Sequence, residues 1–166
     1  HLANRTGDRN QFKEFTDDLN SYRNFHLNEK MYALTLGDMT WDLYWYKNNF
    51  SFPEYLSTVN SQLKGLQIFH TIGNHDFDYK ATSDFAAGSS YRSQIAPMYY
   101  SFNIGKIHYV VMDDIDCSQY DGTTSRKYLE RLSDEQINWL AKDLAYVSKD
   151  TPLIIAMHAP IFRPQE

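Results

Sequence analysis

The stretch that decides the fold is LQIFHTIGNHD, at residues 66–76. Its first seven residues are mainly apolar, as in a buried strand, and Gly73 opens a turn directly after them. Asn74, His75 and Asp76 then place an amide, an imidazole and a carboxylate at the end of that strand. Because open α/β sheets build their sites at the carboxyl ends of strands, the stretch predicts a site as well as a strand.

Two other stretches show the same order of an apolar run followed by polar side chains. Residues 31–36, MYALTL, lead into Asp38, and Asp42 follows four residues later. Residues 153–157, LIIAM, lead into His158. If all three runs are strands that end together, they place a carboxylate, an amide and an imidazole at one site. The pattern therefore predicts a composite site built from segments that lie far apart in the sequence.

The residue types at these strand ends favour divalent metal ions. An aspartate, an asparagine and a histidine form a mixed oxygen and nitrogen ligand set, which suits zinc, manganese or iron better than calcium. An aspartate can also bridge two ions, and a pair of ions clamps both oxygens of an in-line displacement. A second histidine beside such a pair can donate a proton to a leaving group. These features together indicate phosphoester hydrolysis.

Length and composition exclude several other classes of protein. A chain of 166 residues, 42% of them hydrophobic, can form one domain with a real core, or two at most. The formal net charge of −5 provides no electrostatic basis for binding nucleic acid or an anionic membrane. Cys117 is the only cysteine, which excludes an internal disulfide and a cysteine zinc cluster. No apolar run approaches the length of a membrane span.

The periodicity along the chain predicts an α/β fold, with layered mixed β-sheets flanked by helices. Apolar residues recur at helical spacing in three segments, the last of which opens with a capping box, SDEQ. Helices alternating with strands favour a layered α/β unit, to which a hairpin adds an antiparallel pair. The expected helices cover residues 10–28, 53–63 and 133–147, the hairpin covers 99–112, and an irregular insertion with a short helix covers 78–94.

The ordered motifs resemble those of the calcineurin-like metallophosphoesterases. Residues 37–42 match that family's GDxx(x)D motif, residues 73–76 match GNH(D/E), and His158 matches the isolated histidine that follows them. Each motif comes after an expected strand, and the resemblance runs over essentially the whole chain. It implies a metallophosphoesterase-like fold, two divalent metal ions (Mn, Zn or Fe), a metal-activated water and a phosphate-ester substrate.

The resemblance also implies a role for each matching residue. Asp38 would bridge the two ions, and Asn74 and His158 would bind the second of them. His75 would lie beside the phosphoryl group, where it would protonate the leaving oxygen or stabilise its developing charge. Asp42 would orient His75 by accepting a hydrogen bond from its other ring nitrogen.

The two ends of the chain and one motif position depart from the family pattern. Trp41 occupies the position of the tyrosine ligand of purple acid phosphatases, so a tyrosinate–iron site is not expected. The opening His1-Leu2 resembles the end of the family's D-x-H-L motif, which makes His1 either a metal ligand or a frayed terminus. No GHxH follows His158. We therefore expect residues 1–166 to be a catalytic domain truncated at both ends, which alone binds metal weakly or not at all and is inactive.

Alternative interpretations exist for the function and for several acidic residues. A metallophosphoesterase fold that has lost catalysis would act as a binding module for a phosphorylated or protein partner. Asp76 is expected to be a structural helix or turn cap. Asp113, Asp114 and Asp116 resemble a metal cluster in composition, but a solvated loop is the simpler interpretation. Residues 91–113 resemble bacterial family members that carry extra domains and are frequently exported.

Overall fold

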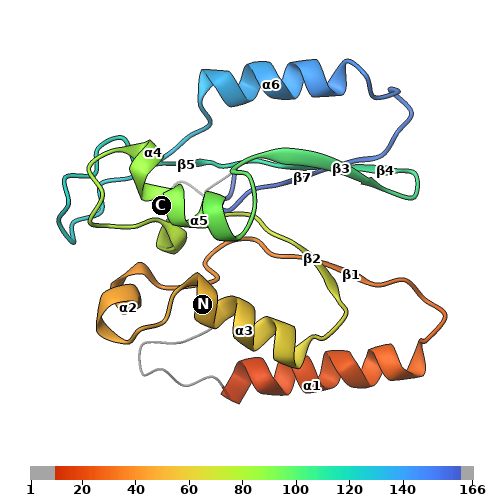
Figure 1. Ribbon diagram of the computed structural model, residues 1–166. Helices are drawn as coiled ribbons and strands as arrows, with labels where there is room; N and C mark the ends of the chain where they lie inside the picture. Colours follow the sequence, from red (N-terminus) through yellow and green to blue (C-terminus); the bar gives the residue numbers. More distant parts are fainter. Residues whose placement is uncertain (1–9, 162–166) are drawn as a thin grey trace, which may run out of the picture.

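The computed structural model describes residues 10–161, and Figure 1 shows their arrangement. This part of the chain contains six α-helices, one short 3-10 helix and seven β-strands. The helices are α1 Asn10–Phe25, α2 Asp42–Lys47, α3 Phe52–Gln62, η1 Asn74–Asp76, α4 Asp84–Ala87, α5 Ser89–Gln94 and α6 Asp134–Leu144. The strands are β1 Tyr32–Leu34, β2 Gln67–Phe69, β3 Tyr100–Ile104, β4 Ile107–Val111, β5 Ile115–Asp116, β6 Leu129–Glu130 and β7 Leu153–Ala156. Within the described residues, no helix combines the length and the apolar character needed to cross a bilayer.

The strands form small sheets in which parallel and antiparallel pairs both occur. Strand β1 pairs with β2 in parallel, with Ala33 opposite Ile68. In the second sheet β4 lies between β3 and β7, antiparallel to the first and parallel to the second. Strands β5 and β6 form a two-stranded antiparallel ribbon. The α/β class with mixed sheets and flanking helices, predicted from the sequence, is therefore confirmed.

Two of the sheets lie between layers of helices, as Figure 1 shows. Helix α6 covers the outer side of the β3–β4–β7 sheet, and α1 and α3 lie on the outer side of β1 and β2. Aromatic rings join the two sheets, because Phe69 of β2 stacks on Phe102 of β3 with ring centroids 3.7 Å apart. Tyr91 and Tyr100 each donate a hydrogen bond of 2.9 Å to the carbonyl oxygen of His70. These contacts hold the end of β2 in a fixed position against the hairpin.

Local sequence signals explain where the longer helices begin. Ser51 and Glu54 form a reciprocal capping box at the start of α3, which also has a proline in its first turn. Ser133 caps α6 by accepting a hydrogen bond from the backbone N–H of Gln136. The side chain of Gln136, expected to complete a capping box, bonds instead to the backbone N–H and carbonyl of Asp113. This bond ties α6 to the end of β4.

Strands β1 and β2 are shorter than the sequence pattern predicts. The apolar runs at 31–36 and 66–72 predict longer strands, but each ladder has three residues. Each strand has one hydrogen-bonded neighbour within residues 10–161, and Tyr32 and Gln67 are exposed at their starts. The buried residues come after β2, so Ile72 enters the core as the chain turns toward the site.

The segment 78–94 contains two short helices, α4 and α5, where the sequence predicts an irregular insertion with one. Tyr91 of α5 is fully buried, and its ring packs edge-on against Phe52 of α3 with centroids 5.9 Å apart. Buried aromatic residues contribute strongly to core stability because of their large apolar area. The insertion is therefore part of the core that supports the strand ends.

Candidate functional site

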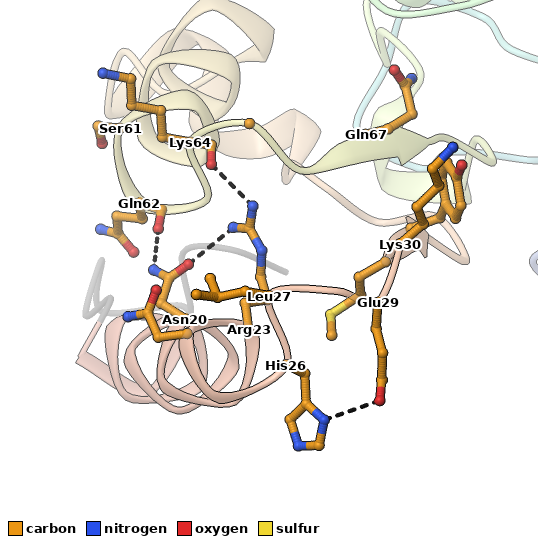
Figure 2. Close-up of a pocket in the computed structure, with 14 residues that line it drawn as sticks. Asn20, Arg23, His26, Leu27, Glu29, Lys30, Ser61, Gln62, Lys64 and Gln67 are labelled. Atoms are coloured by element: carbon orange, nitrogen blue, oxygen red, sulfur yellow. Dashed lines mark hydrogen bonds and ion pairs between the residues drawn. The ribbon is translucent and has the colours of Figure 1, made fainter.

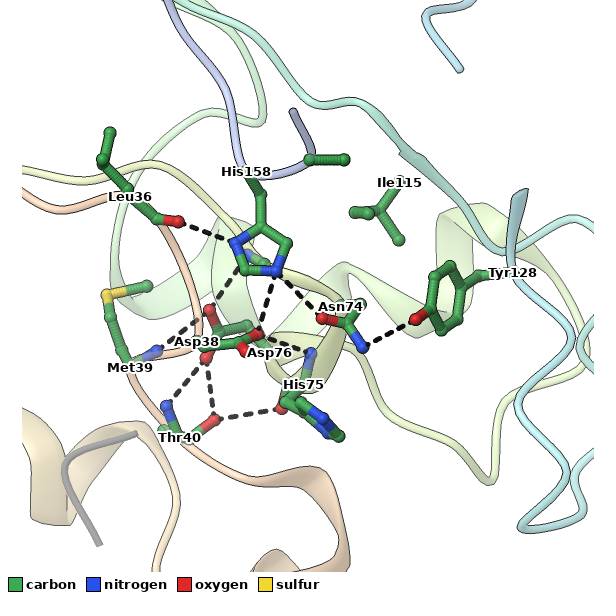
Figure 3. A network of polar contacts seen from close by, with 12 residues as sticks. Leu36, Asp38, Met39, Thr40, Asn74, His75, Asp76, Ile115, Tyr128 and His158 are labelled. Carbon is green, nitrogen blue, oxygen red and sulfur yellow. Dashed lines mark hydrogen bonds and ion pairs between the residues drawn. The ribbon is translucent and has the colours of Figure 1, made fainter. Parts of the chain in front are cut away.

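Three strand ends meet where the sequence predicts a site (Figure 3). Asp38 follows β1, Asn74 follows β2, and His158 follows β7. The Nε2 atom of His158 lies 2.9 Å from Oδ1 of Asn74 and 3.5 Å from Oδ1 of Asp38. The structure thus brings together the predicted metal ligands that it describes. The remaining one, His1, lies outside the described residues.

The donor atoms of these three side chains fit a metal ion. Nδ1 of His158 lies 2.7 Å from the carbonyl oxygen of Leu36, which can only accept a hydrogen bond, so a neutral ring presents its lone pair at Nε2. Ligand atoms about 2.0–2.2 Å from one ion are roughly 3 Å apart, which the separations above resemble. In the described part of the chain no group of three His, Cys, Asp or Glu side chains is arranged to hold a metal ion, so this candidate set of three ligands includes the amide of Asn74.

Gly37 and Gly73 allow the strand ends to approach one another closely. A Cβ atom on Gly37 would lie 2.6 Å from Nδ1 of His158 and 2.7 Å from Cα of Gly73. A Cβ atom on Gly73 would lie 2.5 Å from Oδ1 of Asp38. Gly37 also has a φ of +89°, a conformation that favours glycine. Packing around the site therefore explains the glycine of each motif.

Asp76 joins the loops that follow β1 and β2. Its carboxylate is fully buried and accepts hydrogen bonds of 2.8–3.2 Å from the backbone N–H groups of Met39, Thr40 and Gly73. The hydroxyl of Thr40 donates a further bond of 3.0 Å. Burial raises the pKa of Asp76 to about 6, although the hydrogen bonds from Thr40 and Gly73 oppose this shift. Asp76 is thus a structural cap, as expected, and it links both ligand-bearing loops.

The expectation of a solvated loop is wrong for Asp113 and Asp114. These residues are 6% and 5% exposed. Asp114 accepts hydrogen bonds of 3.1 and 2.8 Å from the backbone N–H groups of His158 and Ala159, so it fixes the chain after β7. Burial raises the pKa of both carboxyl groups. The expectation failed because a polar run in the sequence does not reveal the distant backbone donors that it meets in the fold.

His75 and Asp42, predicted as a catalytic residue and its orienting partner, lie in contact. Nδ1 of His75 is 3.0 Å from Oδ1 of Asp42, which is fully buried at the start of α2. The backbone N–H of His75 donates a hydrogen bond of 3.0 Å to Oδ1 of Asp38. The edge of Trp41 packs against the imidazole, with ring centroids 5.5 Å apart. These contacts fix the imidazole with Nδ1 turned toward Asp42, while the backbone of the same residue is bonded to the ligand set.

Two further side chains reach the site from the loop between β5 and β6. Nη1 of Arg126 lies 2.6 Å from Nδ1 of His75 and 3.0 Å from Oδ1 of Asp42. The hydroxyl of Tyr128 accepts a hydrogen bond of 3.1 Å from Nδ2 of Asn74, as Figure 3 shows. Sequence reasoning missed both residues, because no motif marks this loop and its partners are 51 or more residues away.

A cavity of about 630 Å³ lies at the opposite end of β1 and β2 from the ligand set (Figure 2). Its wall includes four basic side chains, from Arg23, His26, Lys30 and Lys64. The guanidinium of Arg23 is bonded to the side chain of Asn20 at 3.1 Å and to the carbonyl of Lys64 at 3.2 Å. The cavity is therefore separate from the site at the carboxyl ends of the strands.

The comparisons with known proteins point in the same direction as this geometry. The family model described as calcineurin-like phosphoesterase matches residues 1–166, the whole chain. The comparison with curated proteins returned no match. Proteins of the matching family are phosphoester hydrolases that generally use divalent metal ions. The match over the full length shows that the chain belongs to the calcineurin-like phosphoesterase family.

Proposed function

We propose that this protein hydrolyses phosphate esters at a centre of two divalent metal ions. The observation that carries the proposal is the convergence of Asp38, Asn74 and His158, with the backbone N–H of His75 bonded to Asp38. Membership of the calcineurin-like phosphoesterases supports phosphoester hydrolysis as the reaction class. The ligand set lies at the carboxyl ends of strands, which is where α/β sheets generally bind substrates.

In this proposal Asp38 would be shared by the two ions, and Asn74 and His158 would hold one of them. His1 is a candidate ligand of the other. The mixture of carboxylate, amide and imidazole donors suits manganese, zinc or iron. When bound, the ions would polarise the phosphoryl oxygens and lower the pKa of the attacking water.

His75 acts on the leaving oxygen of the substrate. Its backbone N–H bonds to Asp38, so the residue lies next to the ligand set. The ring donates a proton to the leaving oxygen, or a hydrogen bond to its developing charge. Asp42 helps to fix the ring through its contact with Nδ1, and the Trp41 ring packs against it at a steep angle.

The test of this proposal is metal-dependent hydrolysis by the product of the complete reading frame. The protein is stripped with a chelator, reloaded with manganese, zinc or iron, and assayed with one monoester and one diester chromogen. We expect turnover to require added metal. Asn74→Ala should weaken metal binding about ten-fold or more. His75→Ala should keep the metal affinity and lower kcat by roughly 10²–10⁴-fold.

His26→Ala is the matched control, because His26 follows α1 and contacts Glu29 at 3.1 Å, away from the ligand set. Full activity in Asn74→Ala or His75→Ala would contradict the role proposed for that residue. Metal binding without turnover of either chromogen would instead support the alternative, a binding module that has lost catalysis.

A further inference from the structure

The cavity of about 630 Å³ at the opposite end of β1 and β2 from the candidate metal ligands takes no part in the proposed function. We propose that it binds a small organic anion, whose phosphoryl or carboxylate group lies between Arg23 and Lys30. A cavity of this volume is within the range that small-molecule ligands occupy. The proposal concerns this cavity alone, so it stands whether or not the protein hydrolyses phosphate esters.

The charge of the cavity wall is opposite in sign to that of the whole chain, which has a formal net charge of −5. Among the described residues that line the cavity are three Lys and Arg side chains and one carboxylate, namely Arg23, Lys30, Lys64 and Glu29. The carboxylate of Glu29 is engaged by His26, whose Nδ1 lies 3.1 Å from its Oε1. A hollow lined mainly by charges of one sign focuses their field, so this cavity attracts anions.

Neutral groups hold the guanidinium of Arg23 in place, so its charge stays available to a ligand. Its Nη1 donates a hydrogen bond of 3.1 Å to Oδ1 of Asn20, and its Nη2 donates one of 3.2 Å to the carbonyl oxygen of Lys64. Neither acceptor is ionised. A guanidinium has five N–H donors, so three remain after these two bonds. Arg23 is therefore oriented by the protein before any anion binds.

Lys30 lies on the other side of the cavity from Arg23, as Figure 2 shows. Its side chain is exposed and makes no hydrogen bond or ion pair to the part of the chain that the structure describes. In the same view the side chain of Lys64 runs away from Arg23, so Lys64 contributes its carbonyl group rather than its ammonium. An oxyanion in the cavity thus meets a planar guanidinium on one side and an ammonium on the other.

The cavity also has an apolar part, which favours an organic anion over an inorganic one. Leu27, Met31 and Tyr32 line it, and Leu27 and Tyr32 are 81% and 41% exposed. The ring of Tyr32 packs against that of Phe69, with ring centroids 6.4 Å apart, and this contact orients it. The apolar part of a ligand would remove these side chains from water, which stabilises the complex.

Isothermal titration calorimetry of the product of the complete reading frame, freed of metal and of chelator, tests the proposal. Phenylphosphonate and benzoate each combine an aromatic ring with one kind of oxyanion, whereas inorganic phosphate lacks the ring and benzyl alcohol lacks the charge. Phenylphosphonate has no ester bond, so hydrolysis does not contribute to the heat. We expect one of the two aromatic anions to bind about ten-fold or more tightly than both reference compounds. Equal affinities, or no binding in the millimolar range, would overturn the proposal.

Lys30→Gln removes one of the two charges without removing a bond to the described residues. We expect the affinity for the tighter aromatic anion to fall about ten-fold or more, with an unchanged Tm. Lys149→Gln is the matched control, because Lys149 is exposed after α6, on the other side of the molecule from α1 (Figure 1). Equal weakening in the two variants would mean that net charge alone attracts the anion, which contradicts a site between Arg23 and Lys30.

Asn74→Ala separates the cavity from the candidate metal site. We expect this variant to bind the aromatic anion as the parent does, because Asn74 lies at the other end of β2. A loss of affinity in Asn74→Ala as large as that in Lys30→Gln would place the anion at the strand ends and overturn the proposal. A protein without hydrolytic activity would contradict the proposed function, while the titrations would still decide whether the cavity binds an organic anion.

Discussion

The Nε2 atom of His158 lies 2.9 Å from the Oδ1 atom of Asn74, although 84 residues separate the two in the sequence. Asn74 follows β2 and His158 follows β7, and these strands belong to different sheets. The contact therefore forms only when the two sheets pack in one relative position. The geometry of the site consequently depends on how the two sheets pack, and substitutions that disturb the packing should disturb the site.

Replacing Gly37 by alanine tests the close approach of the strand ends. The new Cβ atom would meet Nδ1 of His158 at 2.6 Å and Cα of Gly73 at 2.7 Å, at a φ of +89°. We expect a loss of about 2–4 kcal/mol in the free energy of unfolding, measured with urea. Gly105→Ala is the matched control, because Gly105 has a φ of +60° but nothing within 4 Å of its Cβ position. Equal losses in the two variants would contradict a packing role for Gly37.

Replacing Asp76 by alanine tests the link between the ligand-bearing loops. The change leaves the buried donors of Met39, Thr40 and Gly73 without their acceptor, and we expect a loss of about 2–4 kcal/mol in unfolding free energy. Asp121→Ala is the control, since Asp121 is exposed and should change stability by less than about 0.5 kcal/mol. Chemical denaturation of both variants provides the measurement. An unchanged free energy of unfolding in Asp76→Ala would show that other contacts hold the two loops together.

His70 makes the stability of the fold depend on pH. Burial lowers the pKa of its imidazole to about 4 from the ordinary value of 6.5. Between these values the unfolded chain binds a proton that the folded chain does not, so the folded state loses stability as pH falls through the window. The effect is absent above the unfolded pKa. We expect the urea midpoint of His70→Gln to fall less than that of the parent between about pH 7 and about pH 5.

His26→Gln is the control for this pH experiment, because His26 lies just after α1, where its side chain is 37% exposed. Its pH dependence should follow that of the parent. If the urea midpoint of His70→Gln changes with pH as that of the parent does, another group controls the pH dependence of stability in this range. The carboxyl of Asp76, whose pKa burial raises to about 6, acts in the opposite direction and makes the comparison between variants necessary.

We predict that the contact between His108 and Asp143 stabilises the packing of α6 against the hairpin formed by β3 and β4. Nε2 of His108 lies 2.8 Å from Oδ2 of Asp143, and His108 is 4% exposed. Ser101 donates a further bond of 2.6 Å to the same carboxylate. A double-mutant cycle with alanine at His108 and Asp143 should give a coupling energy of about 0.5–3 kcal/mol in urea unfolding.

The pair of Lys13 and Asp17 on the surface of α1 is the matched comparison for that cycle. Both side chains are at least 60% exposed, so their coupling should be about 0.5 kcal/mol or less. A coupling at His108 and Asp143 no larger than this surface value would contradict their role in holding α6. The comparison separates a buried contact from an ordinary ion pair.

The positions of the candidate ligands were predictable because each of them closely follows an apolar run in the sequence. Asp38, Asn74 and His158 each lie within a few residues of a strand, so the topology of the strands determines where they meet. Strand lengths were less predictable. An apolar run reports burial, but the length of a ladder depends on neighbouring strands, and β1 and β2 have three residues each.

The supporting residues of the site could not be predicted from local patterns. Asp114 lies in a run of aspartates that resembles a solvated loop, yet it is buried against the backbone of His158. Arg126 and Tyr128 lie in a loop without periodicity, and each reaches a partner more than fifty residues away. Contacts of this kind arise when loops approach one another in the fold, and single-sequence periodicity does not record that approach.

A Cβ atom on Gly37 would lie 2.7 Å from Cα of Gly73, so the two strand ends approach each other through their main chains. Under the proposed function, exchanging Asn74 for histidine would change one ligand and leave Asp38 and His158 in place. The protein would in this sense be a scaffold for redesign, in which the proposed ligands could be exchanged one at a time while both glycines are kept.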